Sequence, residues 1–406
     1  MSLNKFCEQG EVLTKDLLEE AKKNILWTAV RPDIVMERGK GMYLWDTEGK
    51  KYLDFIGGWA VTSLGHCPDQ LKSALMEQSS QLVNASPSFY NIEMIKFAKL
   101  LVSNSCFDRV FFASTGAEAN EGAIKIARKY GSKHLNGAYK IITTKGSFHG
   151  RTLATMAATG KDAWKDLYEP KAGGFVHVPF NDLQALVSAT DEKTCAVMIE
   201  PIQGEGGVHE ADCDYIKKLY DFCKEKDILL IFDEVQTGVA RTGKLFAYEH
   251  YEIEPDVMTL AKGIGGGYPL AALMTKEYLN IFEAGDQGGT YSSQPLGMAV
   301  GLAIMTEVLQ KKLWENAVDM EEYIKEKLYQ LQTTYKLRNI RGKGLLLAFE
   351  LPKDNAREVV NECLKAGLII NSPSPNTIRL IPPLIVEKLH VDEMIEILSG
   401  VLDRIQ

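Results

Sequence analysis

The central part of the chain alternates short apolar runs with segments of helical periodicity, and this pattern limits the fold more than any other feature. Strand-like runs are "RVFFAST", "YKIITT", "CAVMIEP", "ILLIFDE", "DVMTLAKG" and "PLAALMTKE", and helical stretches such as "GAEANEGAIKIARKYG" and "DCDYIKKLYDFCKEKD" stand between them. Apolar strands that alternate with helices predict an α/β fold with a mostly parallel sheet covered on both faces. Ligands of such sheets bind beyond the carboxyl ends of the strands.

The two flanks predict a second, smaller α+β domain. Residues 30–57 indicate a meander of antiparallel strands with a hairpin turn at "EGK", and the chain becomes helical from about residue 306. We expect an N-terminal segment (1–58) that joins a small C-terminal domain (306–406), with a large domain (59–305) between them. No linker rich in Pro, Gly or Ser separates these parts, so we expect them to pack tightly.

Composition narrows the class of protein. The formal net charge is −8 without a basic stripe, so nucleic acid is not an expected partner. Seven cysteines form no CxxC pair, which favours free thiols in a reducing compartment over disulfides or a metal site. The polar, acidic N-terminus is unlike a secretory signal, and no apolar run is long enough to span a bilayer. We expect a cytoplasmic enzyme that does not interact with membranes.

A turn of small and hydroxylated residues follows the first central strand. Ser114, Thr115, Gly116 and Ala117 stand between "RVFF" and a helix. Free N–H groups at a helix N-terminus attract anions, so this turn is a candidate phosphate cradle. Ordinary N-capping by Ser114 or Thr115 is the alternative explanation, and the spacing is not that of a nucleotide P-loop.

Asp233 and Lys262 form the second candidate pair. Asp233 follows five apolar residues, and Lys262 stands 29 residues later before the glycines of "KGIGGG". One crossover fits in that interval, so both side chains can reach one cleft at the ends of their strands. A buried carboxylate needs a partner, for which the protonated ring nitrogen of a cofactor is suitable. A turn-capping Asp and a surface Lys are the alternatives.

Other polar residues follow the remaining strands. Phe148 could stack on a planar cofactor and Arg151 could bind a carboxylate, with a core Phe148 and a surface Arg151 as the alternatives. Arg379 stands in a predicted strand of the small domain, where a lone arginine is usually solvated. Glu200 and Glu205 stand beside the glycines of "EPIQGEGG". Together, a phosphate cradle, a strand-end Asp, a stackable Phe and a lysine beside glycines point to pyridoxal 5'-phosphate held by Lys262 as a Schiff base.

At these residues the chain resembles the class III (subgroup II) pyridoxal-phosphate-dependent aminotransferases, and within them the acetylornithine and ornithine enzymes. The motifs are "FFASTGAEANEGAIKIARKYG", "SFHGRTLATMAATG", "MIEPIQGEGGV", "LLIFDEVQTGVARTGKLFAYEHY" and "PDVMTLAKGIGGGYPLAA". The resemblance implies the type I aminotransferase fold, with a seven-stranded sheet in the large domain, and a homodimer whose active sites lie at the interface.

The resemblance also implies roles for single residues. Lys262 would be the Schiff-base lysine and Asp233 the partner of the pyridine nitrogen. The cofactor's hydroxyl, ring and phosphate would contact Gln236, Phe148, Thr115, Gly116 and Ala117, with Thr290 reaching the phosphate of the neighbouring subunit. Arg151 would bind the distal carboxylate of the substrate and Arg379 the α-carboxylate of glutamate. Glu205 would mask Arg379 when an ω-amino substrate enters.

The implied reaction is transfer of an ω-amino group from a carboxylated amine to 2-oxoglutarate, which gives glutamate and a semialdehyde. N-acetylornithine is the first expected donor, with ornithine, γ-aminobutyrate, succinylornithine or another specialised ω-amine as alternatives. Trp59, and "SSQPL" where the family often has "GGNPL", depart from the family pattern near the predicted pocket. A non-catalytic cofactor-binding protein is the alternative of another class.

Overall fold

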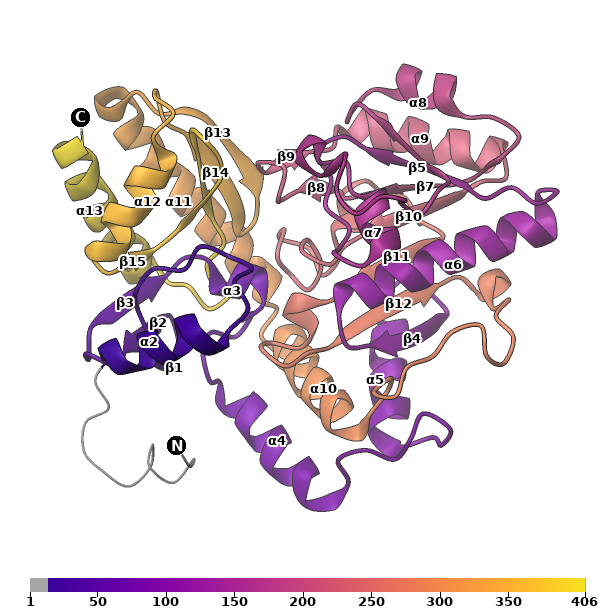
Figure 1. Ribbon diagram of the computed structural model, residues 1–406, viewed down its shortest axis with the longest axis horizontal. Coiled ribbons are helices and arrows are strands. Elements are labelled where there is room, and N and C mark those ends of the chain that lie inside the picture. Colours follow the sequence, from indigo (N-terminus) through magenta and orange to yellow (C-terminus); the bar gives the residue numbers. More distant parts are fainter. Residues whose placement is uncertain (1–13, 406) are drawn as a thin grey trace.

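The computed structural model describes residues 14–405, which form two packed bodies (Figure 1). The first 13 residues, including Cys7 and the start of the predicted N-terminal segment, lie outside the described residues, as does Gln406. In Figure 1 the larger body carries the central sheet, and the smaller one combines the earliest and latest parts of the chain.

The central sheet of the large body has seven strands in the order β4-β12-β11-β10-β7-β5-β6. Neighbouring strands pair in parallel from β11 to β6, whereas β12 runs antiparallel to both of its neighbours. The predicted α/β class with a mostly parallel sheet is therefore confirmed. The strands are β4 (Arg109–Ala113), β5 (Lys140–Thr144), β6 (Phe175–Val178), β7 (Thr194–Ile199), β10 (Leu229–Asp233), β11 (Val257–Leu260) and β12 (Ala271–Thr275).

Successive residues of a strand point to opposite faces of the sheet, and helices cover both faces of this one. On β10, Ile231 packs with α6 (Gly116–His134), whereas Leu230 and Phe232 pack with α9 (Cys213–Glu225) on the other face. Strands that are buried on both sides contain continuous apolar runs. Such runs in the sequence were the basis for predicting most of these strands.

The small body contains an antiparallel sheet in the order β13-β14-β17-β16, formed by Arg338–Lys343, Leu346–Glu350, Thr377–Leu380 and Asn371–Ser374. A second sheet joins the two ends of the chain. Its strands β1 (Met36–Lys40), β2 (Tyr43–Asp46) and β3 (Lys51–Asp54) form the expected meander, and β15 (Leu368–Ile369) pairs with β3. The domain boundaries at residues 58 and 305 stay a prediction.

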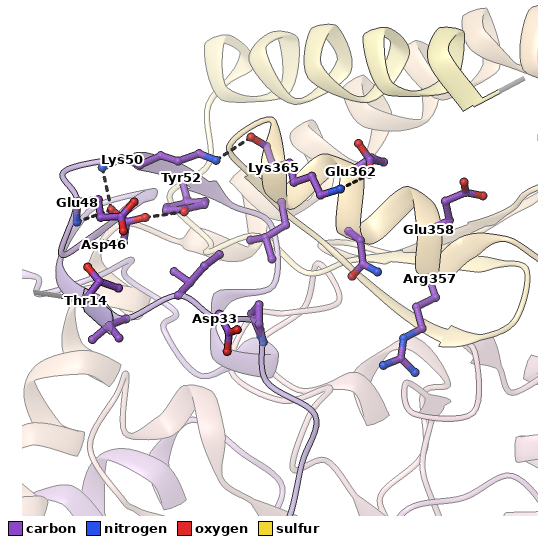
Figure 2. A pocket seen from close by; sticks show the side chains of 15 residues that line it. Thr14, Asp33, Asp46, Glu48, Lys50, Tyr52, Arg357, Glu358, Glu362 and Lys365 are labelled. Carbon is purple, nitrogen blue, oxygen red and sulfur yellow. Dashed lines mark hydrogen bonds and ion pairs between the residues drawn. The ribbon is translucent and has the colours of Figure 1, made fainter. Parts of the chain in front are cut away.

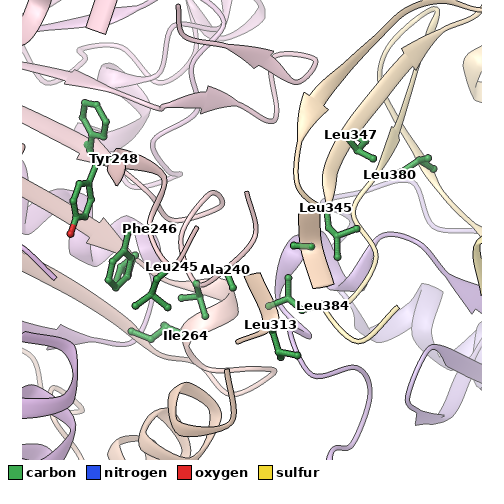
Figure 3. Packing of buried hydrophobic residues seen from close by; sticks show 14 of the residues in the cluster. Ala240, Leu245, Phe246, Tyr248, Ile264, Leu313, Leu345, Leu347, Leu380 and Leu384 are labelled. Atoms are coloured by element: carbon green, nitrogen blue, oxygen red, sulfur yellow. The ribbon is translucent and has the colours of Figure 1, made fainter. Parts of the chain in front are cut away.

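One hydrophobic cluster runs through both bodies (Figure 3). Ala240, Leu245 and Ile264 belong to the large body, Leu345 and Leu380 to the small one, and in the figure Leu313 and Leu384 lie between them. A shared core of this kind resists separation of the bodies, since parting them would expose apolar surface.

The long helical stretch near residue 306 differs from the expected single segment. Helix α10 (Pro295–Gln310) begins earlier and packs against α4 (Asp69–Gln81) and α5 (Ile92–Ser103). A left-handed Lys312 then separates it from α11 (Leu313–Tyr335). The remaining helices and strands are α2 (Thr14–Asn24), α3 (Gly57–Ala60), α7 (Leu153–Ala158), α8 (Leu183–Ala189), β8 (Ile202–Gln203), β9 (His209–Glu210), α12 (Ala356–Lys365) and α13 (Lys388–Ile405). Among residues 14–405, no helix has the length and apolar character needed to cross a membrane.

Candidate active site

A cavity of about 460 Å³ opens at the carboxyl ends of the central strands. Most of the residues singled out in the sequence line it: Thr115, Gly116, Ala117, Phe148, Arg151, Glu205, Asp233, Gln236 and Lys262. They come from five separate stretches of sequence, and the sheet brings them together. This convergence makes the cavity the candidate active site.

Lys262 follows strand β11 and is held in a left-handed backbone conformation, with φ of 50°. A non-glycine residue in this region is uncommon and marks a locally constrained site. Burial lowers the pKa of the Lys262 amine, and the nearby Glu205 and Asp233 carboxylates only partly oppose this effect. A lysine of this kind carries a larger fraction of neutral, nucleophilic amine than a surface lysine does.

Asp233 ends β10, is 3% exposed and accepts hydrogen bonds on both oxygens. Asn120 Nδ2 and His149 Nδ1 lie 2.7 Å and 2.8 Å from its Oδ2, and the Val235 amide donates to Oδ1 at 3.1 Å. These partners fix the orientation of the carboxyl group. Asn120 and His149 were not among the predicted site residues, and the sequence signal that could have found them is their place within the motifs.

The predicted phosphate cradle is also a helix cap. Thr115 caps α6 in a capping box with Glu118, whose carboxylate accepts the Ser114 and Thr115 amides at 2.9 Å each. Gly116 and Ala117 occupy the first helical positions, where N–H groups have no acceptor within a helix. The capping explanation is therefore confirmed, and the phosphate cradle stays a prediction that the position of Gly116 and Ala117 in the cavity wall permits.

Phe148 is placed by its backbone as well as by packing. Its amide donates to Glu200 Oε2 at 2.9 Å. Glu200 is buried and also lines the cavity, and burial raises its pKa well above the ordinary value, reinforced by the charge of Asp233. Glu200 thus fixes the loop that carries Phe148.

Arg379 and Glu205 form a closed ion pair at the edge of the cavity. Arg379 Nη1 donates to Glu205 Oε1 at 2.8 Å and to the Gly204 carbonyl at 2.7 Å, and its side chain is 1% exposed. Burial alone would raise the pKa of Glu205, but the charges of Arg379 and Lys262 outweigh it and keep that pKa low. Glu205 lines the cavity and Arg379 lies behind it.

Two of the cavity residues, Phe148 and Arg151, lie next to Lys161 and Trp164, which do not line the cavity. Arg151 lies over the rings of Phe148 and Trp164, with its guanidinium carbon 5.8 Å and 5.0 Å from their centroids. Lys161 Nζ lies 5.0 Å and 5.5 Å from the same two centroids. Lys161 and Trp164 were missed in the sequence, where "TGKDAWK" reads as an ordinary polar loop.

Besides Arg379, two predicted site residues do not line this cavity within one chain. Thr290 is exposed and lines a separate hollow with Asn84, Ser86 and Pro87. Trp59 is 54% exposed and does not line the cavity, whereas Val61 in the same segment does. The backbone from Gly57 to Ala60 is left-handed throughout, with φ of 61° at Trp59 and 68° at Ala60, which strains the two non-glycine residues.

A larger cavity of about 700 Å³ lies between the N-terminal strands and α12 (Figure 2). Its charged side chains are mostly paired or solvated: Lys50 Nζ donates to the Lys365 carbonyl at 2.7 Å, and Tyr52 donates to Asp46 at 2.7 Å. None of the predicted catalytic residues lines it. Size alone therefore does not identify the active site of this protein.

Comparison with known proteins identifies the family. The Aminotransferase class-III family matches residues 27–402. The chain belongs to the class III aminotransferases. The acetylornithine aminotransferase of Caldanaerobacter subterraneus subsp. tengcongensis is 46% identical over 387 residues, which are 95% of this chain and 98% of that protein. Acetylornithine aminotransferase 2 of Bordetella pertussis is 48% identical, covering 92% of this chain and 95% of the relative.

A solved structure agrees with the fold of this class III aminotransferase. The ornithine aminotransferase from Toxoplasma gondii, with pyridoxal phosphate in part of its active sites, has a TM-score of 0.93 and 28% identity. The match covers 100% of this chain and 98% of that one. The type I aminotransferase fold and pyridoxal phosphate as cofactor are therefore confirmed.

The cavity of this aminotransferase fits that cofactor. Both polar atoms of the Gln236 side chain are buried and, among the described residues, have no hydrogen-bond partner. A buried amide without a partner is costly, and a ligand group in the cavity would satisfy it. The amides at the start of α6, the oriented Asp233 and the amine of Lys262 supply the complementary groups for a phosphate, a protonated ring nitrogen and an aldehyde.

Proposed function

We propose that the chain transfers the ω-amino group of N-acetylornithine to 2-oxoglutarate, giving N-acetylglutamate semialdehyde and glutamate. The closed Arg379–Glu205 pair carries this proposal, because it leaves Arg151 as the arginine open to a substrate carboxylate. A donor whose carboxylate lies far from its reacting amine fits that arrangement. The names of the two relatives described above support the same donor.

Three residues of the cavity would have separate roles in the reaction. When bound, pyridoxal phosphate supplies an aldehyde that condenses with amines and a ring that withdraws electrons from the neighbouring carbon. Lys262 would hold the cofactor before the donor arrives, and its displaced amine would then take a proton from the carbon bearing the donor nitrogen and return it nearby. Asp233 would keep the ring nitrogen protonated, and Phe148 would cover one face of the ring.

Glu205 would act as the switch between the two substrates. With Glu205 on Arg379, the ω-amine donor is accepted and its carboxylate binds Arg151. Glutamate reacts at its α-amine and needs Arg379 for the neighbouring carboxylate, so Glu205 must move away. One cavity can then serve both half reactions.

Substitution of Glu205 by Gln tests this proposal. The neutral amide keeps the size of the side chain but weakens its hold on Arg379, so glutamate should compete better against N-acetylornithine. The ratio of kcat/KM values for the two donors should shift toward glutamate about tenfold. An unchanged ratio would exclude the switch, and absence of N-acetylornithine turnover in the wild-type enzyme would exclude the donor.

We also propose that the enzyme works as a homodimer that shares its active sites. An apolar surface surrounds Thr290: Phe89, Tyr90 and Tyr291 are 68%, 88% and 67% exposed. Asn91 ties the two stretches together by donating to the Ser293 carbonyl at 2.9 Å. Exposed aromatic clusters of this kind are typical of protein interfaces, and here they would carry Thr290 to the neighbouring phosphate.

A cytoplasmic location is part of the same proposal. The six cysteines among the described residues are all free thiols, and burial raises the pKa of the Cys195 and Cys363 thiols to about 12 each. Thiols kept protonated in a core are unreactive and need no oxidising compartment.

A further inference from the structure

Two cations flank a pair of aromatic rings, and of these four residues Phe148 and Arg151 line the active-site cavity. Phe148 and Trp164 meet edge to face, with centroids 5.7 Å apart, and both Arg151 and Lys161 lie within 6 Å of each ring. Arg151 is the residue proposed above for the donor's carboxylate. The second cation, Lys161, has no part in that scheme.

Neither cation is neutralised by a nearby carboxylate. Among residues 14–405, no ion pair or hydrogen bond of either side chain to a carboxylate is present. Lys140, by contrast, pairs with Asp191 at 2.7 Å. Burial lowers the pKa of Lys161, and the charges of Glu205 and Glu200 partly oppose this effect.

The covalent structure of the donor brings its α-nitrogen close to Lys161. In ornithine and N-acetylornithine alike, the α-nitrogen is two bonds from the carboxylate carbon. A carboxylate held by Arg151 therefore places this nitrogen beside the same pair of rings. In N-acetylornithine it is a neutral amide with a carbonyl oxygen, whereas in ornithine it is an ammonium ion.

We propose that Lys161 is a specificity-determining residue that selects donors with an acylated α-nitrogen over donors with a free α-amine. The ammonium of Lys161 donates a hydrogen bond to the acyl carbonyl, and the acyl group packs against the Trp164 ring. A free α-ammonium faces a like charge in the same place and is repelled. This inference rests on the proposed function, since it assumes that the donor's carboxylate binds Arg151.

Substitution of Lys161 by Gln and by Glu tests the inference. We would measure kcat/KM of the cofactor-loaded enzyme for N-acetylornithine and for ornithine. The preference for the acetylated donor should fall about tenfold or more in Lys161→Gln and further in Lys161→Glu, where the new carboxylate attracts the α-ammonium. Lys165→Gln and Lys165→Glu change an exposed lysine on the same segment and should leave the preference unaltered.

Binding without turnover provides a second readout. N-acetylnorvaline and norvaline lack the ω-amine, and neither can condense with the cofactor when it is in its amine form, so calorimetry on that form can compare their affinities for the wild-type and Lys161→Gln enzymes. The variant should lose affinity for the acetylated analogue and gain affinity for the free one. If wild-type enzyme uses N-acetylornithine but Lys161→Gln keeps the wild-type preference in turnover and in binding, the inference is wrong. If the wild-type enzyme does not use N-acetylornithine, the proposed donor fails as well.

Discussion

At the scale of single residues, the site depends on how its two buried carboxyl groups are held. Asp233 receives hydrogen bonds from Asn120 and the Val235 amide, whereas Glu200 accepts one from the Phe148 amide, and burial raises the pKa of Glu200. Two carboxyls of one cavity thus have different hydrogen-bond partners because their surroundings differ. The sequence identified both positions but gave no basis for telling them apart, since burial and hydrogen bonding arise only in the fold.

Substitution of Asp233 by Asn tests the role of its charge. The shape of the side chain is nearly unchanged, but the partner of a protonated ring nitrogen is lost. We expect kcat for N-acetylornithine to fall by about 100-fold or more, and the cofactor to bind more weakly. Asp214→Asn, at an exposed position in the first turn of α9, serves as the control and should leave both quantities unaltered. Wild-type kcat in Asp233→Asn would contradict the assignment.

Burial of His250 should make the folded protein less stable at acidic pH. Burial lowers its pKa from 6.5 to about 4, and its Nε2 lies 3.0 Å from the Thr242 carbonyl. The unfolded chain binds the proton between pH 4 and 6.5 whereas the folded chain does not, so this residue's contribution falls as the pH drops through that window.

Replacement of His250 by Gln should remove this part of the loss of stability at acidic pH. Between pH 7.5 and pH 5, the wild-type protein should lose about 1 kcal/mol more free energy of unfolding than the variant, an amount reduced by the partial exposure of the ring. Denaturant unfolding at the two pH values measures the difference. Equal losses in both proteins would show that His250 titrates alike in the folded and unfolded states.

At the scale of elements, the capping box of α6 should contribute both to the stability of the fold and to the affinity for the cofactor. Thr115 orders the turn through Glu118, while the following two residues line the cavity. Thr115→Ala should therefore reduce the free energy of unfolding by about 1 kcal/mol and also raise the Kd for pyridoxal phosphate. Asp182→Ala removes the cap of α8, away from the cavity, and should change stability without changing that Kd.

Elements were predicted from the sequence where periodicity is strong. Six of the central strands and the N-terminal meander agree with the expected segments because their apolar patterns are local. The edge strand β6 was missed, since it is only partly buried and short. The break at Lys312 was missed, because a lysine in a left-handed conformation carries no sequence signal of the kind a glycine gives. Lys161 and Trp164 were missed for a related reason: only the folded loop brings them over Phe148.

At the scale of the whole molecule, the proposed shared active site requires two chains. Thr290 lies outside its own chain's cavity but within an exposed apolar surface that includes Phe89 and Tyr90. The wild-type protein should therefore sediment as a dimer, and the double change Phe89→Ser with Tyr90→Ser should shift it toward monomer with loss of activity. Tyr329→Ser, at a 52% exposed position of α11, is the control. A fully active monomer would contradict the shared site.

The central claim is that Lys262 and the cavity around it carry out the first half of the transamination of N-acetylornithine. The most direct measurement is the visible absorption spectrum of the cofactor-loaded enzyme, recorded before and after N-acetylornithine is added without any keto acid. We predict that the visible band of the lysine-bound cofactor bleaches as the amine form accumulates, and that 2-oxoglutarate restores it. A visible band that is unchanged by N-acetylornithine would contradict the proposed donor, and absence of any band after addition of pyridoxal phosphate would contradict the role of Lys262.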